Sequence, residues 1–250
     1  MELCQKKDKN LTPEEQADGE KGSQWDHTAI DARSKLLVSL IQGPSRDQET
    51  CDRLVEDFAE RTGREPPELA STDDHAPYKG AFLKTYGEVY QPERKGKTGP
   101  LPKPRKRPPA GMVYATVDKA RENGSVVDVK TTLVFGTEEQ LAAALDNSPV
   151  SSHVNTAFVE RQNGTARHFN PRKQRQTYSF SKQLLEHFAM TWLAVFYYNF
   201  GLAHRALREL TPGPRGEGIY VDRSPAMAAD IADHIWTIEE FLAWQVLGGA

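Results

Sequence analysis

The chain has 250 residues, of which 38% are hydrophobic and 27% charged, and its formal net charge is -3. This length suits one medium domain, or one domain with an arm. No apolar run approaches the ~18 residues of a membrane span, and residues 1–24 lack the pattern of a signal peptide, which argues against membrane-spanning and secreted classes. Cys4 and Cys51 form neither a metal-binding nor a disulfide pattern, so we expect a reducing cytoplasm.

Hydrophobic spacing and turn residues predict an alternation of strands and helices. In chain order, we expect strands at 25–31 and 35–42, a helix at 46–61, a strand at 68–72, a helix at 76–86, strands at 112–117 and 125–135, a short helix capped by Thr137, and helices at 155–169, 181–200, 225–232 and 238–246. The turn Asn123-Gly124 indicates a hairpin. Residues 91–111 are rich in proline, so we expect that segment to be extended and solvated.

The net charge conceals a local asymmetry. Residues 44–74 hold ten acids against four bases, whereas residues 93–107 hold seven bases against one acid, and residues 160–182 hold six against one. Because a binding face responds to its local field, the two basic runs matter more than the total when the partner is a polyanion. A solvated charged surface is the alternative interpretation of such runs.

Asp73 is the first candidate for metal-dependent chemistry. It ends an expected strand just before a helix, where α/β folds commonly place functional groups. The alternative is that Asp73, or its neighbour Asp74, caps that helix, because Asp is a preferred N-cap residue. Two-metal phosphoryl transfer needs several carboxylates that converge on a pair of Mg²⁺ ions about 4 Å apart.

Glu160 is the second candidate. Glu160, Asn163 and Arg167 stand at i, i+3 and i+7, so they share one face of the expected helix. A carboxylate for a metal, together with an amide and a guanidinium for phosphates, suits DNA strand transfer. A lone Glu on a helix is usually a surface residue, so the case for Glu160 depends on the longer pattern around it.

That longer pattern resembles the last acidic motif of insertion-sequence transposases of the Asp-Asp-Glu type. It comprises Asn155-Thr156, Glu160-Arg161-x-Asn163, Arg167 and the run from Thr177 to Lys182, with a long apolar helix afterwards. The run from Asp73 to Tyr78 resembles the second acidic motif of the same family. The resemblance implies that Asp73 and Glu160 are catalytic metal ligands. It also implies that Arg161, Asn163 and Arg167 contact DNA or support the site.

The resemblance extends from about Trp25 to the C-terminus and implies a fold of the α/β class, a ribonuclease H-like mixed sheet flanked by helices. Its parts would be a polar remnant of the first strand at 1–24, a catalytic-type domain at 25–182 and a helical extension at 183–250 packed on that domain. A basic proline-rich arm at 90–111 and a hairpin at 112–135 would be insertions. The resemblance further implies a two-metal site for Mg²⁺ or Mn²⁺, DNA ends and target DNA as partners, and a homo-oligomer on DNA.

The start of the chain departs from the family pattern. The first acidic residue of the family stands in a motif resembling Asp-Glu-x-Trp, ahead of a lysine-rich run that here resembles Lys6-Lys7-Asp8-Lys9. That acidic position would precede Met1, and neither Glu2, Asp26 nor Asp31 replaces it well. We therefore expect a truncated transposase whose isolated chain transfers strands weakly or not at all.

Three alternatives remain open. The chain is the downstream half of a split transposase, a non-enzymatic DNA-binding remnant, or another ribonuclease H-like nuclease such as a junction resolvase. The motif Glu160-Arg161-x-Asn163, followed by Tyr178-Ser179-Phe180-Ser181, argues against a junction resolvase or similar nuclease.

The basic arm is the expected sequence-independent DNA contact, because each neutralised phosphate releases counterions. Its bases are Arg94, Lys95, Lys97, Lys103, Arg105, Lys106 and Arg107. A solvated linker is the alternative. Together these features predict a DNA-associated protein of a prokaryotic cytoplasm.

Overall fold

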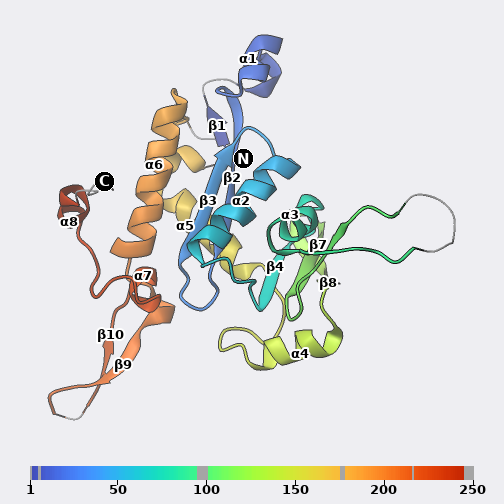
Figure 1. Cartoon of the computed structure of the whole chain (residues 1–250). Coiled ribbons are helices and arrows are strands. Elements are labelled where there is room, and N and C mark those ends of the chain that lie inside the picture. Colours follow the sequence, from blue (N-terminus) through green and yellow to red (C-terminus); the bar gives the residue numbers. More distant parts are fainter. Residues whose placement is uncertain (1, 5–6, 95–100, 175–177, 216, 245–250) are drawn as a thin grey trace, which may run out of the picture. The chain divides into compact units, whose positions relative to one another are not determined.

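The computed structural model describes residues 2–4, 7–94, 101–174, 178–215 and 217–244. The chain forms two compact units, which we call the terminal unit (1–38 and 158–250) and the central unit (39–157). Both combine helices and strands, as Figure 1 shows, so the expected α/β class is confirmed. Within the described ranges, no helix combines the length and the apolar character that crossing a bilayer requires.

The terminal unit combines strands with two 13-residue helices, α5 and α6. Its elements are β1 (Glu2–Cys4), η1 (Asp8–Asn10), α1 (Pro13–Asp18), β2 (Gly22–Ile30), α5 (Ala157–Phe169), η2 (Pro171–Lys173), α6 (Leu184–Phe196), the π-helix η3 (Tyr197–Gly201), η4 (Arg205–Leu207), β9 (Glu209–Pro212), β10 (Gly218–Val221), α7 (Pro225–Ala228) and α8 (Ile238–Ala243). β1 pairs with β2 in antiparallel fashion, and the sheet order is β1-β2-β3. Strand β3 (Leu37–Gly43) begins in this unit.

The central unit is built on a mixed sheet of order β4-β7-β8. Its elements are α2 (Gln48–Arg61), β4 (Leu69–Asp73), α3 (Pro77–Tyr86), β5 (Glu88–Tyr90), β6 (Arg105–Arg107), β7 (Val113–Glu122), β8 (Ser125–Phe135) and α4 (Glu138–Asp146). β4 and β7 are parallel, and the connection between them contains α3. β8 returns antiparallel to β7, so the sheet is mixed.

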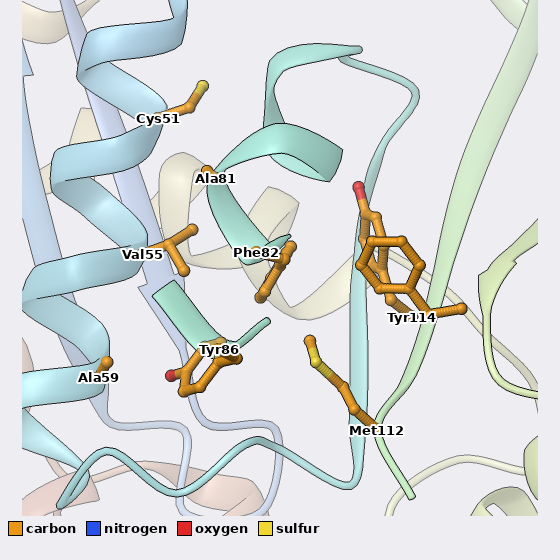
Figure 2. Close-up of a cluster of buried hydrophobic side chains, with 9 residues drawn as sticks. Cys51, Val55, Ala59, Ala81, Phe82, Tyr86, Met112 and Tyr114 are labelled. Atoms are coloured by element: carbon orange, nitrogen blue, oxygen red, sulfur yellow. The ribbon is translucent and has the colours of Figure 1, made fainter. Parts of the chain in front are cut away.

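Strand β7 is the centre of this unit because both faces of its first half, residues 113–117, are buried. Tyr114 points to one side, where it packs against Phe82 of α3 with the ring centroids 4.7 Å apart (Figure 2). Val113 and Ala115 belong to a second cluster, which Leu141 of α4 completes. The alternation of side chains along a strand separates the two clusters. A strand covered on both faces is typical of a parallel sheet in an α/β protein.

The expected hairpin turn and the expected Thr137 cap are confirmed, and Asp47 supplies a cap that was not expected. Asn123 and Gly124 both have positive φ, at 50° and 83°, as a two-residue hairpin turn requires. Thr137 caps α4 through a reciprocal pair of hydrogen bonds with Gln140. Asp47 caps α2, where its carboxylate accepts from the Thr50 N–H at 2.9 Å.

The proline-rich segment differs from its expectation. Arg105–Arg107 form β6, which pairs antiparallel with β5, so the described end of this segment is hydrogen-bonded rather than wholly solvated. The cross-strand partners Glu88 and Arg107 form an ion pair at 3.2 Å. Residues 95–100 lie outside the described ranges.

The long apolar helix also differs from its expectation. Its α-helical part ends at Phe196, and the chain continues through the π-helix at Tyr197–Gly201 instead of reaching Phe200 as one helix. The β9–β10 hairpin that follows was not expected from the sequence.

Candidate functional site

Asp73 is the last residue of β4 and lies opposite Val117 of the parallel strand β7. Its carboxylate is exposed and accepts a hydrogen bond from the Arg46 guanidinium at 3.2 Å. It therefore stands at the carboxyl edge of a parallel strand pair, the edge at which open α/β sheets bind ligands.

The alternative interpretation of Asp73 and Asp74 as helix caps is wrong. The N-cap of α3 is Ala76, with no side-chain cap, and the helix begins at Pro77. Pro needs no capping of its own nitrogen, because it has no N–H at the first helical position. Neither carboxylate has a structural role as a cap at this helix start.

Two tyrosines whose pKa values respond to Asp73, Tyr114 and Tyr78, keep their hydroxyl protons. Burial raises the pKa of Tyr114 to about 12, and the charges of Asp73 and Asp74 add to that rise. The Tyr114 hydroxyl shares a hydrogen bond of 2.8 Å with Thr72. Burial also raises the pKa of Tyr78, and Asp73 contributes in the same direction. The edge thus holds Asp73 in front of neutral rings, and a metal ion would compete with the Arg46 guanidinium for its carboxylate.

A complete metal site is not formed in the part of the chain that the structure describes. Among those residues, no group of three or more His, Cys, Asp or Glu is placed to hold a metal ion. Asp73 supplies the hard oxygen atoms that Mg²⁺ prefers. It would need further carboxylates beside it to bind a pair of ions.

Helix α5 carries the second group of predicted residues, and Glu160 lies in its first turn. Glu160 and Arg161 are exposed, whereas Asn163 and Arg167 are half-buried. The predicted spacing is therefore realised on a helix, with Gln162 buried between the exposed and half-buried positions. A carboxylate in the first turn also benefits from the positive end of the helix dipole.

Asp73 belongs to the central unit and Glu160 to the terminal unit. The surroundings of each carboxylate are therefore given within its own unit only. The convergence of the two carboxylates on one site remains a prediction.

Two acids that were weighed as replacements for a first catalytic residue have structural partners. Asp26 of β2 forms an ion pair with the buried ammonium of Lys173. Asp31 holds the turn after β2, because its carboxylate accepts from the Ser34 N–H at 2.7 Å. The side chain of Glu2 lies outside the described parts.

The basic arm is described in part. Arg105, Lys106 and Arg107 are exposed on β6. Lys106 donates to the carbonyl oxygen of Lys84, and Arg107 pairs with Glu88. The described arm also includes Arg94 and Lys103, which are exposed, whereas Lys95 and Lys97 lie outside the described ranges.

Sequence reasoning missed two basic residues near α5. Lys35, in the turn between β2 and β3, places its ammonium 3.6 Å from the ring centroid of Phe158. His204 follows the π-helix, and its pKa is lowered by burial and by the charges of Lys35 and Arg161. These residues come from segments far apart in the chain, and no local pattern marks them.

Comparison of the chain with protein-family models, with curated proteins and with solved structures gives no match.

Proposed function

We propose that the chain is a DNA-binding protein of the ribonuclease H-like transposase type, related to enzymes that cleave and join DNA by metal-dependent phosphoryl transfer. The observation that carries this proposal is the position of Asp73 at the carboxyl end of β4, in a parallel β4–β7 pair. A functional carboxylate at that edge is the placement that α/β folds favour.

The order of the elements supports the proposal. Three strands, β1 to β3, precede α2, and then come β4, α3 and β7. The helix that carries Glu160 follows later in the chain. This order is compatible with a ribonuclease H-like fold in which the β5–β6 hairpin, β8 and α4 are additions.

Asp73 and Glu160 are the residues that would hold the metal. Bound Mg²⁺ ions would activate the attacking hydroxyl and stabilise the leaving oxygen. Arg161, Asn163 and Arg167 would orient the DNA backbone from α5, because a guanidinium and an amide match phosphate oxygens. The exposed bases of β6 would add sequence-independent attraction.

A second candidate function is DNA binding without catalysis. It is favoured by the absence, among the described residues, of any group of three acids or other ligands that could hold a metal. Metal sites depend on ligand count and geometry, so two carboxylates alone would bind a pair of ions poorly. We therefore expect the isolated chain to bind DNA and to cleave it weakly or not at all.

The test measures binding and cleavage on the same preparation. Binding of a short fluorescent duplex is followed by anisotropy over a range of salt, and cleavage by nicking of supercoiled plasmid with Mg²⁺ or Mn²⁺. The variants are Asp73→Asn and Glu160→Gln, and the matched control is Asp118→Asn, an exposed acid on β7.

Three results decide between the candidates. Salt-sensitive binding with cleavage that both variants abolish, and that the control retains, supports the transposase-type function. Salt-sensitive binding without cleavage supports the second candidate. Failure to bind duplex DNA even at low salt contradicts both.

A further inference from the structure

Tyr90 is an aromatic residue on the two-stranded β5–β6 ribbon, and core packing does not explain its position. It is 36% exposed, and its neighbour Val89 is 69% exposed. Neither belongs to the two buried clusters of the central unit. A two-stranded ribbon is only marginally stable in water, so a ribbon that leaves an aromatic ring partly exposed forgoes burial that would stabilise it. The ring is therefore accessible to a ligand.

The ribbon has one face toward α3 and one face away from it. Lys106 lies on the first face, because its ammonium donates to a carbonyl oxygen in the last turn of α3. Side chains alternate along a strand, so Arg105 and Arg107 lie on the second face. Tyr90 stands opposite Arg105 in the register of the two strands. Glu88 stands opposite Arg107, and these two pairs make up the face that points away from α3.

This face combines one aromatic ring with two guanidinium groups. The Arg107 guanidinium lies 5.9 Å from the centroid of the Tyr90 ring, near the outer limit of a cation–π contact. Arg107 also pairs with Glu88 at 3.2 Å, so its charge is offset within the ribbon. No acid among the described residues pairs with Arg105 in this way. The face therefore carries an excess of positive charge beside a ring that is partly open.

Contacts on both sides of Tyr90 hold the two chains of the ribbon together. The amide of Gln91 donates to the Pro102 carbonyl oxygen at 2.5 Å, one residue beyond Tyr90. The ion pair between Glu88 and Arg107 joins the strands on the other side. A ring that is held before binding loses less conformational freedom when a ligand stacks on it.

We propose that Tyr90 and Arg105 form a stacking site for an unpaired base, and that the site takes a single-stranded segment of DNA. The phenol ring supplies a flat face for the base, and the guanidinium supplies donors for a neighbouring phosphate. A base inside a duplex is already stacked, so it would have to leave its pair to reach the ring. The choice of DNA rests on the proposed function. The stacking site adds to it a preference of the arm for single strands, which charge alone would not give.

The experiment compares three fluorescent ligands of equal length, which are a single-stranded oligothymidine, an abasic strand with the same phosphates, and a duplex. Each is titrated by anisotropy at several salt concentrations with the full chain and with Tyr90→Leu, Tyr90→Phe and Arg105→Gln. Tyr90→Leu keeps an apolar side chain without the ring, whereas Tyr90→Phe keeps the ring. The matched control is Tyr220→Leu, which removes an exposed tyrosine from the other two-stranded ribbon, β9–β10.

We expect the wild type to bind the single strand more tightly than the abasic strand. Tyr90→Leu should weaken single-strand binding about fivefold or more, because the stacked base loses its aromatic partner. The same variant should leave binding of the abasic strand and of the duplex unchanged. Tyr90→Phe and Tyr220→Leu should match the wild type, and Arg105→Gln should lower the salt slope of single-strand binding by about 0.7. Circular dichroism identifies any variant that has unfolded.

The three ligands separate this proposal from the proposed function. If DNA binds and Tyr90→Leu matches Tyr220→Leu, or weakens all three ligands alike, the stacking site is overturned and the proposed function stands. Equal binding of the single and abasic strands by the wild type overturns the site without the use of any variant. If the duplex does not bind even at low salt, but Tyr90→Leu still weakens single-strand binding, the proposed function fails and the stacking site stands. If no ligand binds, both are overturned.

Discussion

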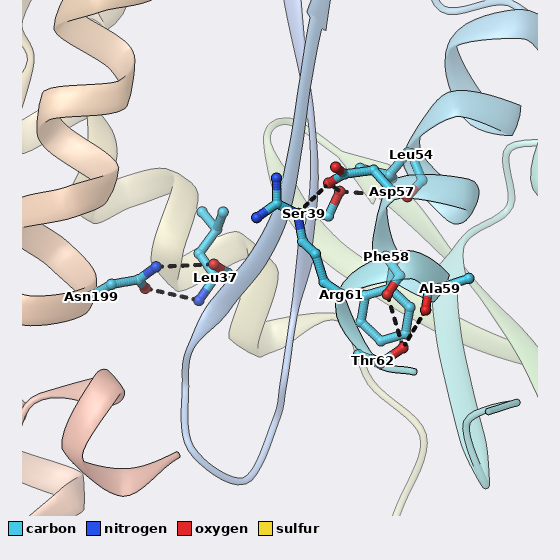
Figure 3. Close-up of polar contacts among 9 residues, drawn as sticks. All are labelled: Leu37, Ser39, Leu54, Asp57, Phe58, Ala59, Arg61, Thr62 and Asn199. Carbon is cyan, nitrogen blue, oxygen red and sulfur yellow. Dashed lines mark hydrogen bonds and ion pairs between the residues drawn. The ribbon is translucent and has the colours of Figure 1, made fainter. Parts of the chain in front are cut away.

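Asn199 holds the backbone of Leu37 with both ends of its side-chain amide. Its Nδ2 donates to the Leu37 carbonyl at 3.0 Å, and its Oδ1 accepts from the Leu37 N–H at 3.0 Å (Figure 3). The amide thereby replaces the two hydrogen bonds that a neighbouring strand would make. Strand β3 lies at the edge of its sheet, so this residue satisfies backbone groups that would otherwise stay unpaired.

Loss of this amide should destabilise the terminal unit. Asn199 and Leu37 are both buried, so Asn199→Ala leaves a backbone donor and acceptor without partners. We expect a loss of about 2 kcal/mol in the free energy of unfolding, measured by urea denaturation. Asn147→Ala, at the exposed end of α4, is the control and should change that free energy by less than about 0.5 kcal/mol. Equal effects of the two substitutions would contradict the role of Asn199.

Two consecutive residues of the π-helix, Tyr198 and Asn199, hold the segment that leads into β3. Tyr198 donates to the carbonyl of Lys35, and Asn199 pairs with Leu37. Consecutive residues thus contact the last part of the β2–β3 turn, at Lys35, and the first residue of β3, at Leu37. π-Helical turns are frequent at functional sites, and here the turn also leads to His204.

The pKa of His204 should depend on Lys35. Burial lowers that pKa below its ordinary value of 6.5, and the charges of Lys35 and Arg161 lower it further. Lys35→Met removes one repulsive charge, so the pKa should rise toward 6.5, as an NMR titration of the imidazole would show. In the folded wild type this ring binds its proton less readily than in the unfolded chain, so its contribution to stability is lost as pH falls below 6.5. An unchanged pKa in the variant would place Lys35 too far from the ring.

The N-cap residue of α2, Asp47, should make the free energy of unfolding depend on pH in the acidic range. The pKa of Asp47 is lowered from 3.8 to about 2, first by the Thr50 N–H and then by the hydroxyls of Ser45 and Thr50. Because the folded pKa is the lower one, the contribution is complete above pH 4 and lost as pH falls toward 2. Asp47→Asn keeps a capping oxygen without the charge. The urea midpoints of wild type and Asp47→Asn should differ near neutral pH and converge near pH 2. A constant difference over that window would contradict the charge as the cause.

The single thiol of the central unit should be protected in the folded chain. Cys51 is fully buried in α2, and burial raises the pKa of its thiol to about 11. Because the thiolate is the reactive form, modification by an aromatic disulfide at pH 8 requires the unit to open. In a Cys4→Ser background we expect slow reaction without denaturant and rapid reaction in urea. Rapid reaction of the native chain would mean that α2 leaves the core easily.

The elements that sequence reasoning located correctly carry strong local signals. The periodicity from Cys51 to Ala59 fixed α2, and Asn123-Gly124 fixed the β7–β8 turn, because only a few residues tolerate the backbone that such a turn requires. Helix α5 begins at Ala157, two residues later than expected, and still carries Glu160 and Arg167 on its length. The local sequence pattern therefore predicted correctly that Glu160 and Arg167 lie on one helix.

The features that were missed depend on partners distant in the chain. Strand β6 consists of three consecutive bases, which lack the apolar alternation of a strand, and forms because β5 lies beside it. The π-helix at Tyr197–Gly201 has no sequence signal, because its residues continue an apolar helical pattern. Lys35 and His204 stand far apart in the chain, so periodicity could not relate them.

The bases of the arm should not contribute equally to DNA binding. Arg107 is paired with Glu88 and also stacks near the Tyr90 ring at 5.9 Å, so a phosphate must compete with these partners. Removing the acid with Glu88→Gln should free the guanidinium and tighten duplex binding most strongly at low salt. Glu122→Gln removes the same charge from the exposed end of β7 and is the control. Titrations by anisotropy should show a larger gain for Glu88→Gln. Equal gains would mean that net charge alone, rather than release of Arg107, governs the response of the arm.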